Sequence, residues 1–246
     1  MEPVREPEIP AVRTIQPLDR VAAFVEVLLC SGFPTQLLLI GLMMNAGMRM
    51  QTPDGRLSPP FIFTLSLVDT VLVVGLVCFF LLAHRESPRG VLFGRRPIGR
   101  EVLLGIALVP AVFMMVMLVL MVILTIAPQL HNVPRNPLAD MLQTWGDAVI
   151  FGVVAMVAGG VREEIQRAFI IHRFEGFLGG GLVGVFVFSA LFGLGHIEQG
   201  YDAAIATGSL GAIWGLVYLA RRSVVAPMVS HAAFNLAQLI KFVSTQ

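Results

Sequence analysis

An ionised cluster inside an apolar stretch is the part of this sequence best suited to chemistry. Glu163, Glu164 and Arg167 lie within residues 148–171, which are otherwise apolar enough to cross a membrane. Moving one ionised group to the centre of a bilayer costs about 2.5–3.5 kcal/mol, so these side chains must face protein or trapped water. On a helix Arg167 shares a face with both glutamates, four and three residues before it. We therefore predict a functional site here.

Three further polar residues lie in later apolar stretches. His196 ends the sequence Phe-Gly-Leu-Gly-His, and His231 and Asn235 are four residues apart, which places them on one helix face. With a rise of about 1.5 Å per residue, these side chains reach a depth in the membrane similar to that of Glu163. The topology thus predicts that side chains from three separate helices converge.

These residue types together are suited to hydrolysis. A carboxylate such as Glu163 can take a proton from water, and a histidine can hold or protonate the reacting group. Asn235 could donate to a developing oxyanion. Glu163, His196 and His231 also match a catalytic zinc site with an open position. The residues alone leave both chemistries open, with or without a divalent metal.

Other hydrolytic arrangements lack a signal in the sequence. Ser189 and Ser230 are isolated, and neither a Gly-x-Ser-x-Gly nor a His-Glu-x-x-His motif occurs. Cys30 and Cys78 lie in apolar stretches without metal-ligand spacing, where a cysteine behaves as a small apolar residue. A serine or cysteine nucleophile is therefore not expected.

Composition places the chain in a membrane. Of its 246 residues, 56% are hydrophobic and only 13% are charged, whereas a soluble domain carries about 25% charged residues. The net charge is +1, and no basic run with interleaved aromatic residues occurs, so we expect the lipid bilayer and not nucleic acid as a partner. We expect an integral protein of a bacterial-type cytoplasmic membrane.

The apolar stretches predict an all-α, polytopic bundle of about seven transmembrane helices. They cover residues 21–44, 61–83, 102–127, 148–171, 182–196, 203–219 and 224–243. The fifth and sixth are short and close in sequence, which predicts a tight helical hairpin.

The same pattern divides the chain into four parts. They are a disordered cytoplasmic tail (1–20), an N-terminal group of about three helices (21–127), a polar loop (128–147) and a catalytic core of four helices (148–246). The tail and alternate loops hold eleven basic residues, against four on the opposite side. The positive-inside rule then places the N-terminus in the cytoplasm and the C-terminus outside.

The C-terminal half of the chain resembles the CPBP family of CAAX prenyl proteases and bacteriocin-processing intramembrane proteases. This family is related to the Ras-converting type II CAAX endopeptidase. The resemblance rests on three motifs in order, which are Glu163-Glu164 followed by Arg167, Phe192 followed by His196, and His231 followed by Asn235. It covers roughly residues 145–243. The family usually has three residues between the second glutamate and the arginine, whereas here there are two, which rotates the guanidinium by about 100° on a helix.

The resemblance implies an intramembrane endopeptidase whose site opens to the cytoplasmic side. Glu163 would activate the attacking water with help from His196, while His231 and Asn235 would stabilise the tetrahedral oxyanion. Glu164 and Arg167 would orient and tune the base. The substrate would be a peptide or a membrane protein, and a zinc ion on Glu163, His196 and His231 is the alternative mechanism.

Two other functions remain open at this point. The shifted arginine is compatible with a catalytically silent relative that binds a lipid or peptide tail, as an immunity-type protein would. A small proton-coupled transporter could use Glu163 and Glu164 as a relay, although no internal repeat supports it. Outside these motifs, Asp69 and Glu26 are expected to be structural or interface residues, and Glu198 and Asp202 to lie in a solvated loop.

Overall fold

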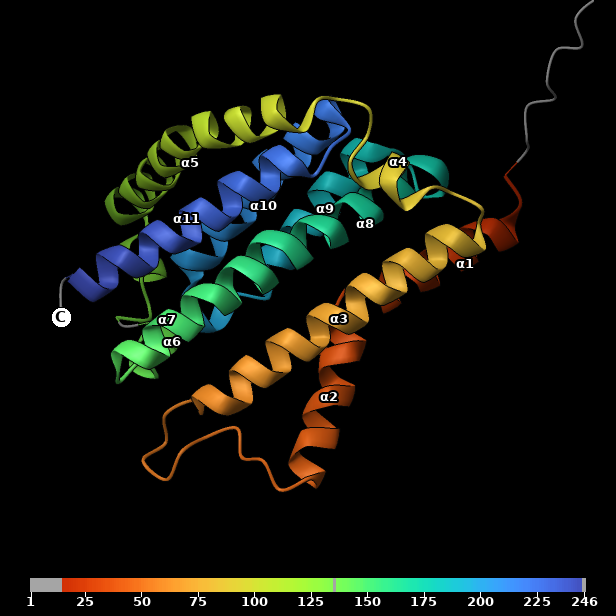
Figure 1. Cartoon of the computed structure of the whole chain (residues 1–246). Helices are drawn as coiled ribbons and strands as arrows, with labels where there is room; N and C mark the ends of the chain where they lie inside the picture. Colours follow the sequence, from red (N-terminus) through yellow and green to blue (C-terminus); the bar gives the residue numbers. More distant parts are fainter. Residues whose placement is uncertain (1–14, 135, 245–246) are drawn as a thin grey trace, which may run out of the picture.

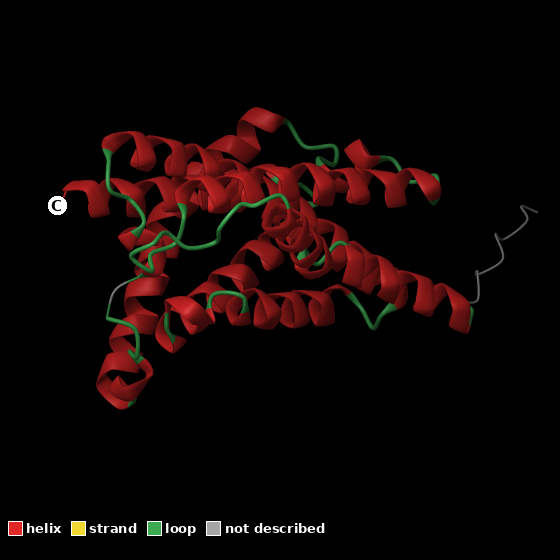
Figure 2. Ribbon diagram, turned by 90° about the horizontal axis from the view of Figure 1, so that it is seen from below, coloured by secondary structure: helices red, strands yellow, loops and turns green. Residues whose placement is uncertain are grey.

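The computed structural model describes residues 15–134 and 136–244, and it is built from helices. Figure 2 shows helices joined by loops, and within the described residues the only β pairing is an isolated bridge between Gln51 and Leu57. The expected all-α class is confirmed. The predicted disordered tail lies outside the described residues up to residue 14. Helix α1 begins at Pro17, so its last four residues are helical.

The N-terminal half contains five helices. They are α1 (Pro17–Leu29), α2 (Phe33–Asn45), α3 (Pro59–Ala83), α4 (Pro88–Leu92) and α5 (Ile98–Ile126). The single predicted helix over 21–44 is wrong, because α1 and α2 are separate and bent by 43°. Pro34 has no N–H and would clash with the preceding turn of a continuous helix. Gly32 supplies the left-handed backbone of the break, with a φ of 83°.

The C-terminal half begins with short elements in the predicted polar loop and continues with longer helices. The elements are η1 (Pro128–Leu130), α6 (Pro137–Asp140), α7 (Trp145–Val154), the π-helical segment η2 (Ala155–Arg162), α8 (Glu163–Phe177), α9 (Gly181–Leu194), η3 (Ile197–Gln199), α10 (Tyr201–Arg221) and α11 (Val225–Ser244). The predicted fourth span corresponds to the unbroken run from α7 to α8. Such π-helical turns occur mostly within α-helices and often at functional sites.

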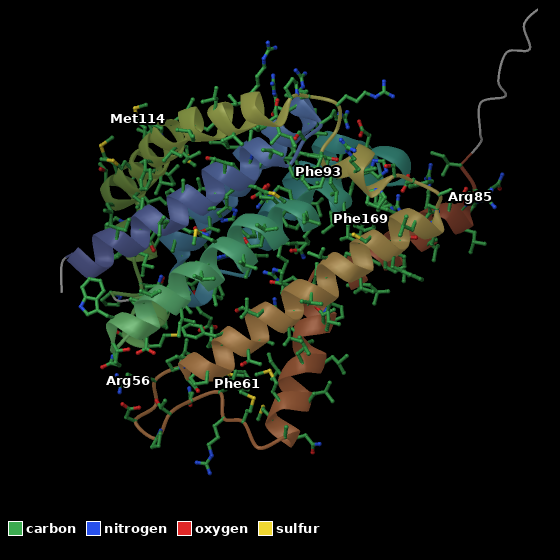
Figure 3. All side chains as sticks on the ribbon, viewed as in Figure 1. Arg56, Phe61, Arg85, Phe93, Met114 and Phe169 are labelled. Carbon is green, nitrogen blue, oxygen red and sulfur yellow. The ribbon has the colours of Figure 1, made fainter. Side chains whose placement is uncertain are left out.

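Several helices are suited to a membrane. Among the described residues, α3, α5 and α10 are long and apolar enough to cross it, and the bent pair of α1 and α2 raises the number to four. Helix α9 and residues Val225–Ile240 of α11 are apolar but shorter. Met114 on α5 points outward and is 68% exposed, as expected of a lipid-facing residue (Figure 3). The chain is thus an integral membrane protein.

The run from α7 to α8 is the central element of the bundle. In Figure 1 it lies between α3 on one side and α11 on the other, and η2 contacts both. Helix α9 packs on α8, and α5 packs on α11. Phe169 of α8 is fully buried (Figure 3). The two glutamates therefore begin α8 at a position enclosed by both halves of the chain.

Helices α9 and α10 form the predicted hairpin. The two helices are in extensive contact, and a Cβ atom on Gly193 would lie only 2.6 Å from the carbonyl oxygen of Ala204. Glycine thus permits the close approach. Helix α9 ends at Leu194, so His196 lies in the turn of the hairpin and not within the helix.

Candidate active site

Glu164 is the centre of a buried ionic cluster. Its Oε1 accepts a hydrogen bond from Nη1 of Arg167, and Nδ1 of His231 lies 2.8 Å from the same oxygen. The side chains of Glu164 and Arg167 are each 1% exposed. Buried charges are tolerated when they are paired and hydrogen-bonded. The arginine predicted to share a face with both glutamates thus pairs with the second.

Glu163 lies on the other side of the same imidazole. Its Oε2 is 3.8 Å from Nε2 of His231, and its side chain is 15% exposed. Because Nδ1 of His231 is held by the Glu164 carboxylate, the remaining ring nitrogen faces Glu163. A separation of this size is one that a single water in contact with both atoms can bridge.

Aromatic rings hold His231 and Arg167 in place. The indole of Trp214 stacks on the imidazole of His231, with centroids 3.9 Å apart and planes 18° apart. The guanidinium of Arg167 lies 5.0–5.6 Å from the ring centroids of Phe188, Phe192 and Trp214. Nε and Nη2 of Arg167 are buried without a hydrogen-bond partner. Aromatic faces, which attract cations, surround the part of this charge that Glu164 does not bind.

The π-helical segment η2 brings Asn235 of α11 close to this cluster. Nδ2 of Asn235 donates to the carbonyl oxygen of Ala155, 3.2 Å away. A Cβ atom on Gly159 would lie 2.5 Å from that nitrogen and 3.7 Å from Nε2 of His231. The absence of a side chain at Gly159 therefore leaves the space in which Asn235 and His231 approach η2.

His196 borders the cluster without joining it. Its Nδ1 lies 2.8 Å from the carbonyl oxygen of Phe192, and the ring of Phe192 lies edge-on to both His196 and His231. Within the described residues, no hydrogen bond or ion pair links His196 to a glutamate. The structure thus gathers Glu163, Glu164, Arg167 and His231, and places Asn235 and His196 at the edge.

The zinc alternative is not formed in this arrangement. Among the described residues, no group of three or more His, Cys, Asp or Glu side chains is placed to hold a metal ion. Nδ1 of His231 is already engaged by Glu164, which leaves that histidine one nitrogen for any other partner. We therefore derive no step of the reaction through a metal.

Sequence reasoning missed a contact between the cluster and the N-terminal half. Arg162 donates from Nη2 to Oε1 of Glu163 over 3.1 Å and from Nη1 to Oδ2 of Asp69 in α3. The signal was present, because an isolated aspartate in the apolar stretch 59–83 needs a partner in the membrane. Trp214 was also missed, and an aromatic residue in an apolar helix gives no such signal.

One comparison with known proteins finds a similarity in the C-terminal part of the chain. Residues 144–237 match the family model described as type II CAAX prenyl endopeptidase Rce1-like. No curated protein and no solved structure matches the chain. The matched range contains all six predicted site residues and excludes Asp69. Residues 144–237 are therefore similar to the Rce1-like type II CAAX prenyl endopeptidases, the family that the three motifs also indicate.

Proposed function

We propose that this protein is an intramembrane endopeptidase in which Glu163 activates water for attack on a peptide bond. The observation that carries the proposal is the position of Glu163 Oε2, 3.8 Å from Nε2 of an imidazole whose other nitrogen is held by Glu164. A water between these two atoms is in contact with a base and with a group that can donate or accept a proton. The family match supports the same reaction class.

The reaction balances with these groups alone. Glu163 takes one proton from water, and the hydroxide oxygen bonds to the carbonyl carbon of the substrate. The negative charge on the former carbonyl oxygen is stabilised by hydrogen bonds from protonated His231 and from Asn235, whose amide has a second N–H besides the one given to Ala155. Glu163 then passes its proton to the amide nitrogen as the C–N bond breaks, which yields a carboxylic acid and an amine.

The other predicted residues have supporting roles in this proposal. Glu164 fixes the orientation of His231 through its contact with Nδ1, and Arg167 holds the Glu164 carboxylate in place. His196 assists from the turn of the α9–α10 hairpin, where its ring lies edge-on to Phe192. Because no direct contact joins His196 to Glu163, this role requires that both side chains contact the bound substrate.

The substrate is a peptide segment or a membrane protein that reaches the site from the bilayer. We place seven membrane-crossing segments in the chain, with α1–α2 as one bent segment and α7–α8 as another. The site then opens to the cytoplasmic side, where the N-terminus also lies. The four-helix core from residue 148 onward holds the catalytic groups, and nucleic acid has no role.

Cleavage by the purified protein in lipid vesicles, measured against a library of peptides and transmembrane segments, tests the proposal. We expect Glu163→Gln and His231→Ala to abolish cleavage and His196→Ala to reduce it strongly. Glu198→Gln is the matched control, since Glu198 is exposed in the hairpin turn and this change should leave the rate unaltered. Equal activity in the wild type and in all three site variants would refute the site, and a silent wild type would favour the binding protein.

A further inference from the structure

Arg162 connects the N-terminal helices to the proposed base. Its three guanidinium nitrogens each have an acceptor, with Nε 3.4 Å from the carbonyl oxygen of Ala158, Nη1 bound to Asp69 and Nη2 3.1 Å from Glu163 Oε1. A planar guanidinium with all its nitrogens engaged has a fixed orientation. Arg162 is therefore a rigid link between α3 and the first residue of α8.

Asp69 is itself held in place by α2. Its Oδ1 accepts from the hydroxyl of Thr35 over 2.5 Å, and its Oδ2 accepts from Nε2 of Gln36 over 3.2 Å. The Asp69 side chain is 1% exposed. Removing one partner of a buried ionic network leaves the other charge uncompensated. The Asp69 carboxylate thus holds Arg162 in place. Asp69 and its partners in α2 lie outside residues 144–237.

The break between α1 and α2 is shaped to receive this link. A Cβ atom on Gly32 would lie 3.5 Å from Nη1 of Arg162 and 3.4 Å from Nε2 of Gln166. Gln166 donates to the carbonyl oxygen of Cys30 over 2.7 Å, a group made available where α1 ends. Two polar residues that flank the glutamates therefore lie at the same bend.

The two oxygens of Glu163 are given different partners by this arrangement. Arg162 binds Oε1, which leaves Oε2 facing the imidazole of His231. We propose that Arg162 and Asp69 are positioning residues that orient the Glu163 carboxylate toward His231, so that α2 and α3 complete the site. This inference rests on the proposed function, because it assigns Arg162 and Asp69 a role through the base of that reaction.

A second buried ion pair provides the matched control. Arg173 of α8 donates from Nε to Glu26 Oε2 over 2.6 Å, and both side chains are largely buried. Like Asp69 and Arg162, this pair joins an N-terminal helix to the central element, but it does not contact Glu163. A substitution that removes the Glu26 charge therefore measures the structural effect of breaking a buried ion pair between an N-terminal helix and α8.

Steady-state cleavage by the full chain in lipid vesicles separates the two effects. We expect Arg162→Gln and Asp69→Asn to lower kcat by about 10- to 100-fold, the range that misplacement of a reacting group produces, with KM within about threefold of wild type. Glu26→Gln should lower the melting temperature while leaving kcat near the wild-type value. Arg162→Lys, which keeps the charge and one donor to each carboxylate, should recover part of kcat.

The outcomes are distinguishable. An active wild type whose kcat is unchanged in Arg162→Gln would overturn the positioning role and leave the proposed function intact. The positioning role would also be overturned if Arg162→Gln and Glu26→Gln lost kcat equally for the same decrease in melting temperature. A structural effect would then explain both losses. Absence of cleavage in every protein, wild type included, would overturn the proposed function and this inference with it.

Discussion

Adjacent glutamates in this site have different surroundings. Glu164 is bound by a guanidinium and an imidazole in a fully buried position, so its carboxylate is already engaged by Arg167 and His231. Glu163 is partly exposed and has one oxygen directed at His231. A carboxylate must keep a free oxygen to take a proton from water. The first glutamate is thus suited to act as the base and the second to support it.

This difference predicts that the same substitution, glutamate to glutamine, affects stability at Glu164 but not at Glu163. Glu163→Gln should abolish cleavage and leave the melting temperature within a few degrees of wild type. Glu164→Gln should destabilise the protein by about 3–5 kcal/mol, because it leaves Arg167 as an unpaired buried cation, and should reduce cleavage as a consequence. Thermal unfolding in detergent, measured beside the vesicle assay, checks both. A larger loss of stability in Glu163→Gln than in Glu164→Gln would contradict the assignment.

At the scale of the element, the π-helical segment η2 determines how closely α11 approaches the glutamates. Gly159 leaves room for Asn235 and His231. Gly160 is equally close to α11, since a Cβ atom there would lie 2.7 Å from the Cβ of Ala232. Packing at η2 thus sets the distance between the helices that carry the proposed base and the proposed oxyanion donors.

Adding one methyl group at Gly159 should therefore impair the reaction. Gly159→Ala would place a Cβ atom 2.5 Å from Nδ2 of Asn235, so that the amide must move away from the site. We expect a decrease in kcat of about 10-fold or more, on the principle that small displacements in an active site have large effects. Gly176→Ala in α8 is the control, because a Cβ atom there meets nothing within 4 Å. Unaltered kinetics in Gly159→Ala would show that this approach is not needed.

The sequence predicted which segments are helical better than it predicted where the helices bend or end. Each predicted apolar stretch is mainly helical, although 21–44 is broken into α1 and α2, since apolar runs of this length leave few alternatives in a membrane. The bend at Gly32 was missed although Gly32 and Pro34 mark it in the sequence, because the apolar residues on both sides predict one continuous span. The motif spacing predicted that Arg167 shares a face with the glutamates, but its choice of Glu164 depends on how α8 packs against α9 and α10. The pairing of Asp69 with Arg162, 93 residues apart, has no local pattern at all.

At the scale of the whole molecule, buried ion pairs join the N-terminal helices to the central element. Asp69 pairs with Arg162, and both Glu26 and Glu86 pair with Arg173. Helices α1 and α3 cover one side of α8 (Figure 1). Residues 144–237 alone would therefore expose two arginines that are buried in the full chain.

A fragment of residues 144–246 should accordingly be unstable and inactive in lipid. The reason is that Arg162 and Arg173 would lose their carboxylate partners within a low-dielectric environment. Co-expression with residues 1–143 should restore folding and cleavage, as measured by protease resistance and by the vesicle assay. A fragment that melts cooperatively and cleaves at the wild-type rate would show that the N-terminal helices are dispensable.

The ion pair between Glu86, which follows α3, and Arg173 of α8 should make the stability of the folded protein depend on pH. Glu86 lies in the loop after α3, with Oε2 2.6 Å from Nη1 of Arg173 and Oε1 2.9 Å from Nε2 of His172. Burial by itself raises the pKa of Glu86, but the hydrogen bonds from Arg173 and His172 outweigh it and hold the pKa below its usual value of 4.5. Glu26 is the second carboxylate bound to this arginine, and its other oxygen lies 2.6 Å from Nε2 of His84.

A carboxyl group with a lowered pKa stabilises the folded state when it is ionised. The contribution of Glu86 is therefore complete above about pH 4.5, the usual value for a glutamate, and is lost as the pH falls below it. Glu86→Gln should lower the melting temperature by a few degrees at pH 7, since 1 kcal/mol corresponds to about 2–4 °C in a chain of this size. The difference from wild type should shrink toward zero in acid. Glu198→Gln, in an exposed turn, should show no difference at either pH, and a Glu86 effect that persists unchanged in acid would refute the ionic link.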